Sequence, residues 1–181
     1  MALVRRFILL ERSICGAGSA LRAGCRNYSF LPASYHLDDT WAKRLDSSFV
    51  KQIRLEQFFN ELRKKFEADG MGSPLDVDIF ATAVQRPEDL DSLHELLVFL
   101  RNSKNTPLTR SSTFNAVIRT HLDLERYDDL MKILADKIKY GIFLDHYTAN
   151  LLMDKFIELK RLPDAVRVAI DLMFQEDFDH P

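Results

Sequence analysis

The sequence has few residues that break helices, and little that would crosslink the chain or hold it in a membrane. Its 181 residues include only six glycines and six prolines, a scarcity that favours helices. Both cysteines, Cys15 and Cys25, lie within the first 28 residues, so a chain cleaved after residue 28 would have neither a disulfide nor a cysteine-ligated metal. No stretch approaches the roughly 20 apolar residues of a membrane-spanning helix. We therefore expect a helical protein without a membrane span.

Charge is unevenly distributed along the chain. The formal net charge is −2, but residues 1–28 contain five arginines and a single acid, Glu11. Residues 29–181 are left with 20 bases and 26 acids, a formal charge near −6. Charge-driven binding of nucleic acid needs clustered Lys and Arg to neutralise phosphates. The acidic body argues against such binding in general, although it leaves room for a local basic face.

The first 28 residues have the composition of a mitochondrial transit peptide. Apolar residues recur at helical spacing between the arginines, and lysine is absent. Arg26 stands third from a possible cut between Tyr28 and Ser29, which resembles a matrix-protease site. The pattern predicts cleavage there and import into the mitochondrial matrix. Two alternatives stay open: a secretory signal, which the dispersed arginines disfavour, and a disordered basic arm.

Within residues 29–72, which we expect to be an N-terminal arm and helix, residues 29–40 are predicted to be irregular and a helical segment is predicted from Trp41 to Asp69. This predicted arm differs in its bounds from the segment that is named the arm below. The aromatic rings of Tyr35 and Trp41 have two interpretations, as anchors on a partner surface or as a lid on the chain's own core. Residues 73–107 read as a degenerate helix pair. The apolar stripes of these helices are Leu55, Phe58, Phe59, Leu62 and Phe66, and then Leu90, Leu93, Leu96, Leu97 and Leu100.

The last third of the chain repeats itself with a period of 35 residues. Thr113-Phe114-Asn115-Ala116-Val117-Ile118 recurs as Thr148-Ala149-Asn150-Leu151-Leu152-Met153. A fixed period of this length is typical of stacked helix-turn-helix units, each of which buries its apolar face against its neighbours. We therefore predict an all-α fold, a short α-solenoid, with repeats over residues 111–145 and 146–181. Such arrays usually bind a polymer or a partner protein.

The repeat pattern also predicts helix bounds and inward-facing side chains. The second helix of the first repeat is expected over residues 127–140, and Pro163 is expected to begin the last helix. Ser111 or Ser112 can cap one first helix and Asp145 the other. The array ends with an apolar outer face and no polar cap, which predicts a truncated chain or a fragment. The side chains expected inward are Phe114, Val117, Ile118, Leu122, Leu130, Ile133, Leu134 and Ile138, then Leu151, Leu152, Phe156, Ile157, Val166, Ala169, Ile170 and Met173.

The repeat resembles the pentatricopeptide repeat. The resemblance rests on a Thr-aromatic-Asn start at Thr113-Phe114-Asn115 and on an ending at Gly141-Ile142-Phe143-Leu144-Asp145. The second copy is weaker, with Ala149 at the aromatic position. A denser resemblance, over residues 112–181, is to the family of the animal mitochondrial small-subunit ribosomal protein twenty-seven. It implies a non-catalytic matrix protein that docks on small-subunit rRNA and on neighbouring mitochondrial ribosomal proteins, without a cofactor or a small-molecule substrate.

Residues for RNA contact follow from the same resemblance. In base-reading members of the repeat family, the asparagine of the first helix and the last residue of the repeat read one base together. The corresponding pairs are Asn115 with Asp145, and Asn150 with His180. The alternative is that both asparagines satisfy backbone groups at a helix start. Two repeats would read two bases, too few for an address.

Basic side chains give a second set of RNA candidates, with solvated helix faces as the alternative interpretation. Lys160 and Arg161 lie in a turn between helices, where a phosphate could approach easily. His94-Glu95 begins a zinc-protease pattern that Val98 breaks, and the histidines are dispersed, so we expect no metal site and no catalytic residue. The remaining basic candidates are Arg63, Lys64 and Lys65, then Lys132, Lys137 and Lys139, and Lys155.

Three functions are compatible with these observations. The first is a structural scaffold of the mitochondrial small ribosomal subunit. The second is a free mitochondrial RNA-binding factor that acts on transcript processing or stability, which the acidic body and the few repeats disfavour. The third is an adaptor that binds a peptide or a helix in its groove.

Overall fold

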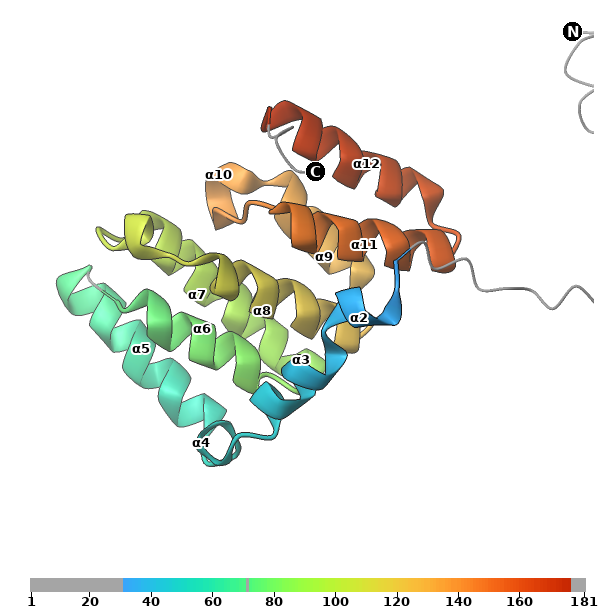
Figure 1. The fold of residues 1–181 in the computed structure, drawn as a ribbon. Coiled ribbons are helices and arrows are strands. Elements are labelled where there is room, and N and C mark those ends of the chain that lie inside the picture. Colours follow the sequence, from blue (N-terminus) through green and yellow to red (C-terminus); the bar gives the residue numbers. More distant parts are fainter. Residues whose placement is uncertain (1–30, 71, 177–181) are drawn as a thin grey trace, which may run out of the picture.

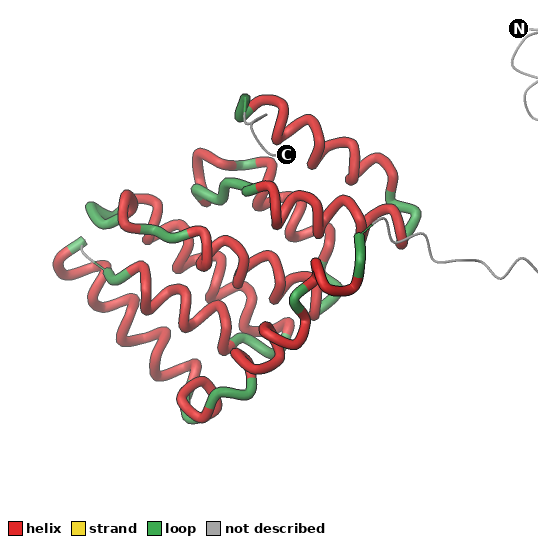
Figure 2. Tube along the Cα trace, in the orientation of Figure 1, coloured by secondary structure: helices red, strands yellow, loops and turns green. Residues whose placement is uncertain are grey.

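The structure, a computed structural model, describes residues 31–70 and 72–176, and these residues form helices and connecting loops without any strand (Figures 1 and 2). The predicted all-α class is confirmed over this part of the chain. None of the helices in it is long and apolar enough to cross a membrane. The proposed cleavage site at Tyr28 and Ser29, and His180, lie outside the described residues.

The helices follow one another with short connections. Two 3-10 turns, Pro87–Asp89 and Thr106–Leu108, precede α7 and α8 respectively. The α-helices are α2 (Ala33–His36), α3 (Asp38–Leu45), α4 (Ser48–Lys51), α5 (Leu55–Asp69), α6 (Pro74–Ala83), α7 (Leu90–Asn102), α8 (Ser111–Asp123), α9 (Tyr127–Ala135), α10 (Lys137–Tyr140), α11 (His146–Glu158) and α12 (Leu162–Phe174).

Helices α5, α6, α8 and α11 lie one after another in Figure 1, and α7 and α9 lie behind them. Helix α5 contacts α6 and α7, α6 contacts α7 and α8, α8 contacts α9, and α11 contacts α12. Apolar side chains from α5 to α12 meet in one buried cluster, and removing them from water is the main favourable term in folding. The largest fully buried side chains of this cluster are Leu62, Phe80, Leu93, Leu96, Leu97, Ile118, Leu130, Ile133, Ile142, Leu152 and Phe156.

The N-terminal segment is more structured than predicted. Residues 29–40 were expected to be irregular, but α2 and the start of α3 lie within them. The helical segment expected from Trp41 to Asp69 is divided into α3, α4 and α5, because Arg54 is extended and the Ser47 side chain begins a new helix by accepting from the Val50 amide. Helices α2 and α3 run across the other helices instead of packing in line with them (Figure 1). We call this segment, residues 33–45, the arm.

Two expectations for the second helices are wrong. The helix expected over residues 127–140 breaks at Asp136, whose carboxylate accepts from the Lys139 amide and starts α10. Ile138 is consequently 87% exposed rather than inward. In α12, Ala165 and Val168 are buried, whereas the exposed apolar side chains include Val166, Ile170 and Met173. Helix α12 packs on α11 by a different face from the one that hydrophobic spacing suggested.

Candidate nucleic-acid interface

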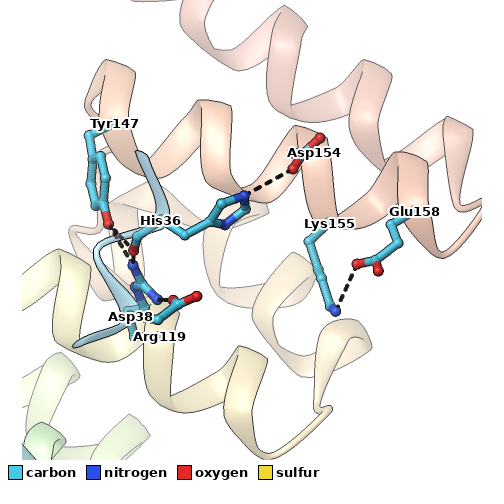
Figure 3. Close-up of polar contacts among 7 residues, drawn as sticks. All are labelled: His36, Asp38, Arg119, Tyr147, Asp154, Lys155 and Glu158. Atoms are coloured by element: carbon cyan, nitrogen blue, oxygen red, sulfur yellow. Dashed lines mark hydrogen bonds and ion pairs between the residues drawn. The ribbon is translucent and has the colours of Figure 1, made fainter. Parts of the chain in front are cut away.

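The predicted base-reading asparagines lie on α8 and α11, next to the arm. The arm is held there by the side chain of Arg119, which projects from α8 and is only 6% exposed. Arg119 Nη1 donates to Asp38 Oδ1 at 2.7 Å, and Nη2 donates to the His36 carbonyl and to the Tyr147 hydroxyl (Figure 3). Tyr147, on α11, also donates to the His36 carbonyl at 2.9 Å. One guanidinium therefore joins the arm to two helices.

Further contacts hold the arm along its length. Asn150 Nδ2 donates to the Tyr35 hydroxyl at 3.0 Å, and the rings of Tyr35 and Tyr147 lie 5.5 Å apart. His36 Nε2 is 3.3 Å from the buried carboxylate of Asp154 (Figure 3). The Trp41 indole donates to Asp123 Oδ2 at 2.7 Å. Tyr35 and Trp41 thus close on the chain's own helices.

The first predicted pair consists of residues in different surroundings. The Asn115 side-chain oxygen is buried and has no hydrogen-bond partner in the described part of the chain. Asn115 lines a small cavity of about 140 Å³ together with Trp41 and Arg44. The Asp145 carboxylate instead accepts from the Thr148 amide at 2.8 Å and caps α11, as predicted. The Asn150 amide donates to the Tyr35 hydroxyl of the arm. The two asparagines therefore do not both satisfy backbone groups at a helix start, which was the alternative to base reading.

Lys160 and Arg161 also differ. Lys160 is exposed and has a positive φ of 59° in the turn between α11 and α12. Arg161 Nε donates to Asp164 at 2.7 Å, and its Nη2 donates to Asp128 at 2.5 Å. Its guanidinium also lies 5.7 Å from the centre of the Phe156 ring. In this conformation Arg161 is committed to partners within the chain, whereas Lys160 is free to meet a phosphate.

Most of the other basic candidates are neutralised by acids. Lys132 donates to Asp129 at 2.9 Å, and hydrogen bonds from Lys132 and then Arg126 lower the pKa of Asp129 to about 2. Of the basic candidates from the sequence, Lys64, Lys139 and Lys160 have no such acidic partner in the described part of the chain. The other pairs are Arg63 with Glu67, Lys65 with Asp76, Lys137 with Asp171 and Lys155 with Glu158.

A basic edge that the sequence did not reveal is formed where α5, α7 and α10 end. The connection after α7 adjoins the one after α5, because the Lys104 amide donates to the Gly70 carbonyl at 3.3 Å. The last turn of α7 meets α10, where Arg101 Nε donates to the Ile138 carbonyl at 3.3 Å. Three exposed bases belong to this edge and have no acidic partner in the described part: Lys104, Arg110 and Lys139. We call these three residues and their connections the loop edge. They are scattered in sequence, so only the packing of helix ends brings them together.

Two histidines are paired inside the stack. The Nε2 atoms of His94 and His121 lie 3.0 Å apart, with their rings nearly parallel. Burial lowers the pKa of both, that of His121 to about 4, because the charged imidazolium is poorly solvated there. Nowhere in residues 31–70 and 72–176 do three or more His, Cys, Asp or Glu side chains come together in a way that could hold a metal ion.

Taken together, these features describe an all-helical protein with a covered polar face and an exposed basic edge. The chain matches the family described as mitochondrial 28S ribosomal protein S27 over residues 1–181, its whole length, and it belongs to that family. It is therefore a mitochondrial protein of the small ribosomal subunit. The resemblance to this ribosomal protein family is confirmed, whereas membership of the wider pentatricopeptide family stays a prediction.

Proposed function

We propose that the protein is a structural, non-catalytic component of the mitochondrial small ribosomal subunit in the matrix. It is a short α-solenoid of pentatricopeptide-like repeats that contacts rRNA and neighbouring ribosomal proteins. Residues 1–28 direct import and are removed between Tyr28 and Ser29. The observation that supports rRNA contact most strongly is the loop edge, because its three bases are exposed and carry uncompensated charge.

The turns within the helix pairs support the repeat interpretation. Glu125 and Lys160, which are 35 residues apart, have positive φ values of 55° and 59°. The next amide closes both turns in the same way: Arg126 donates to the His121 carbonyl at 2.9 Å, and Arg161 donates to the Phe156 carbonyl at 2.7 Å. Two turns with equivalent hydrogen bonds at the sequence period are what stacked helix-turn-helix repeats require.

Contact with rRNA through the loop edge would be of the phosphate type. Lysine and arginine ammonium and guanidinium groups neutralise phosphates without reading bases, and such contacts position a protein on a folded RNA. Lys160 offers a separate contact, because it lies in the turn between α11 and α12, whereas the residues of the loop edge lie between α7 and α8 and in α10. The two basic regions would therefore touch different RNA segments.

Protein contact is supported by the exposed face of α12. Val166, Ile170 and Met173 are 55%, 44% and 62% exposed, and Leu162 and Phe174 are also exposed. Large apolar side chains exposed together on one helix favour a protein interaction site. This observation keeps the adaptor function as a second role that is compatible with the scaffold.

The loop edge can be tested by its salt dependence. A full-length variant with Lys104→Gln, Arg110→Gln and Lys139→Gln should dissociate from purified small subunits at lower salt than the wild type, since each phosphate contact contributes to the salt slope. The control carries Lys51→Gln, Arg86→Gln and Lys132→Gln, which remove the same charge from exposed bases that already have acidic partners. Equal dissociation of the two variants would contradict rRNA contact by the loop edge.

A further inference from the structure

The arm occupies the surface on which the family resemblance places RNA bases. Asn150, a predicted base-reading residue, donates a hydrogen bond from its side-chain amide to Tyr35 of the arm. Asn115 lines a cavity that residues of the arm also line. We propose that the arm, residues 33–45, is a permanent occupant of this face, which is thereby a peptide-binding surface closed to single-stranded RNA. The proposal does not depend on the loop edge or on the ribosomal role.

The charge of the face supports a peptide occupant. Helices α6, α8 and α11 have three carboxylates in contact with the arm, those of Asp78, Asp123 and Asp154, against the one guanidinium of Arg119. Lys155 and Glu158 line a cavity beside the arm and pair with each other, so they add no net charge (Figure 3). Asp78 and Asp154 are 7% and 4% exposed, so solvent screens them poorly. A phosphodiester backbone brought to these carboxylates would meet like charge in a poorly solvated place.

The arm supplies the complementary groups. Arg44 Nη2 donates to Asp78 Oδ1 at 2.8 Å, the Trp41 indole donates to Asp123, and the His36 ring meets Asp154. In return, Asp38 and the His36 carbonyl accept from Arg119 (Figure 3). The three carboxylates and Arg119 therefore each have a complementary partner on the arm, an arrangement that a poly-anion cannot reproduce.

The contacts of Arg119 with Asp38, the His36 carbonyl and Tyr147 hold the arm firmly, and we call them the clamp. Arg119 reaches Asp38, the His36 carbonyl and Tyr147 at once, so that three fixed donor directions are satisfied by groups on both sides of the interface. Without the arm, Arg119 would keep only Tyr147 among these partners. Opening the face would therefore break its charge-assisted hydrogen bonds to Asp38 and to the His36 carbonyl, which disfavours an open state.

The experiment is hydrogen exchange on the full-length protein, with and without a 20-residue oligouridine containing 4-thiouridine. We expect the amides that are hydrogen-bonded within residues 33–45 to be protected, and we expect oligouridine to change neither their exchange nor crosslinking at Asn115 and Asn150. Faster exchange of the arm on adding oligouridine, with crosslinks at these asparagines, would overturn the proposal. Unprotected arm amides in the protein alone would overturn it too.

Variants separate the clamp from the fold. Arg119→Gln should speed exchange of the arm at least tenfold while α5 to α7 keep their protection. A second variant, His36→Ala with Trp41→Phe, removes two other contacts of the arm, those with Asp154 and Asp123, without changing α8 or α11. The control is Lys43→Gln, on the arm but exposed and outside these contacts. If both test variants exchange like the control, the clamp does not exist. Co-sedimentation with the small subunit is expected in every variant, so the failure of this proposal leaves the ribosomal role intact.

Discussion

The helix pairs α8–α9 and α11–α12, which carry the 35-residue sequence repeat, have the same turn but bury their second helices differently. In both, an αL residue and an arginine–aspartate pair close the turn, through Arg126 and Asp129 in one and Arg161 and Asp164 in the other. Helix α9 then buries Leu130, Ile133 and Leu134, whereas α12 buries only Ala165 and Val168. Local sequence thus determines the turn, while the surrounding helices determine which apolar side chains leave water.

The largest effect expected from this comparison concerns two isoleucines. Ile133 is 1% exposed on α9 and Ile170 is 44% exposed on α12. Ile133→Ala should lower the free energy of unfolding by about 3 kcal/mol, because it leaves a cavity in packed surroundings. Ile170→Ala should cost less than about 1 kcal/mol, since no buried contact is lost. Urea unfolding of the full-length variants measures both, and similar losses would show that α12 is as well packed as α9.

An effect of comparable size on the free energy of unfolding is expected when the pH is lowered, because His121 occupies the position that Phe156 has one sequence period later. His121 lies 35 residues before Phe156, and both are fully buried. With a pKa of about 4 in the folded protein and about 6.5 when unfolded, His121 makes the unfolded state bind more protons in acid. Its contribution to stability is complete above pH 6.5 and falls by about 3 kcal/mol as the pH drops through 4.

His121→Phe, which introduces the residue of the second repeat, tests this origin. Chemical unfolding of the variant and the wild type between pH 7 and 4 should show a steeper loss of stability for the wild type. Burial also lowers the pKa of His94, so some acid sensitivity will remain in the variant. Parallel stability curves would mean that His121 does not titrate within the fold.

The smallest effect compares the starts of α8 and α11. Asp145 caps α11, whereas the equivalent Arg110 begins α8 without a side-chain cap, although both have an extended backbone. Asp145→Ala should lower the free energy of unfolding by about 1 kcal/mol, and Arg110→Asp should raise it by up to about 1 kcal/mol through a new cap to the Thr113 amide. Thermal and urea unfolding check both. A loss of stability in both variants would show that the two helix starts are not equivalent.

Features encoded over a few residues could be predicted from the sequence. Helical spacing gave the all-α class, and Asp145 three residues before Thr148 gave a cap that the structure contains. Ser112 was a candidate cap for α8, but its hydroxyl donates to Asp78 instead. The break at Asp136 was missed because a carboxylate that caps a new turn looks, in a periodic pattern, like any polar residue on a helix surface.

Features that depend on distant segments could not be predicted. The arm meets α8 and α11 through pairs more than 80 residues apart in sequence, such as Arg119 with Asp38 and Asn150 with Tyr35. The hydrophobic periodicity of the sequence does not predict contacts between such distant residues. The loop edge has the same origin, since α7, which precedes Lys104, and α10, which carries Lys139, are distant in sequence and contact each other only in the fold. RNA contact by Asn115, Asp145, Asn150, Lys160 and Arg161 stays a prediction.

The most direct test of the proposed scaffold role is sedimentation of the tagged full-length protein from mitochondrial lysate, with and without ribonuclease. The proposal predicts migration with the small subunit, and release into light fractions once the rRNA is digested. Migration in light fractions without ribonuclease would contradict a role in the small subunit.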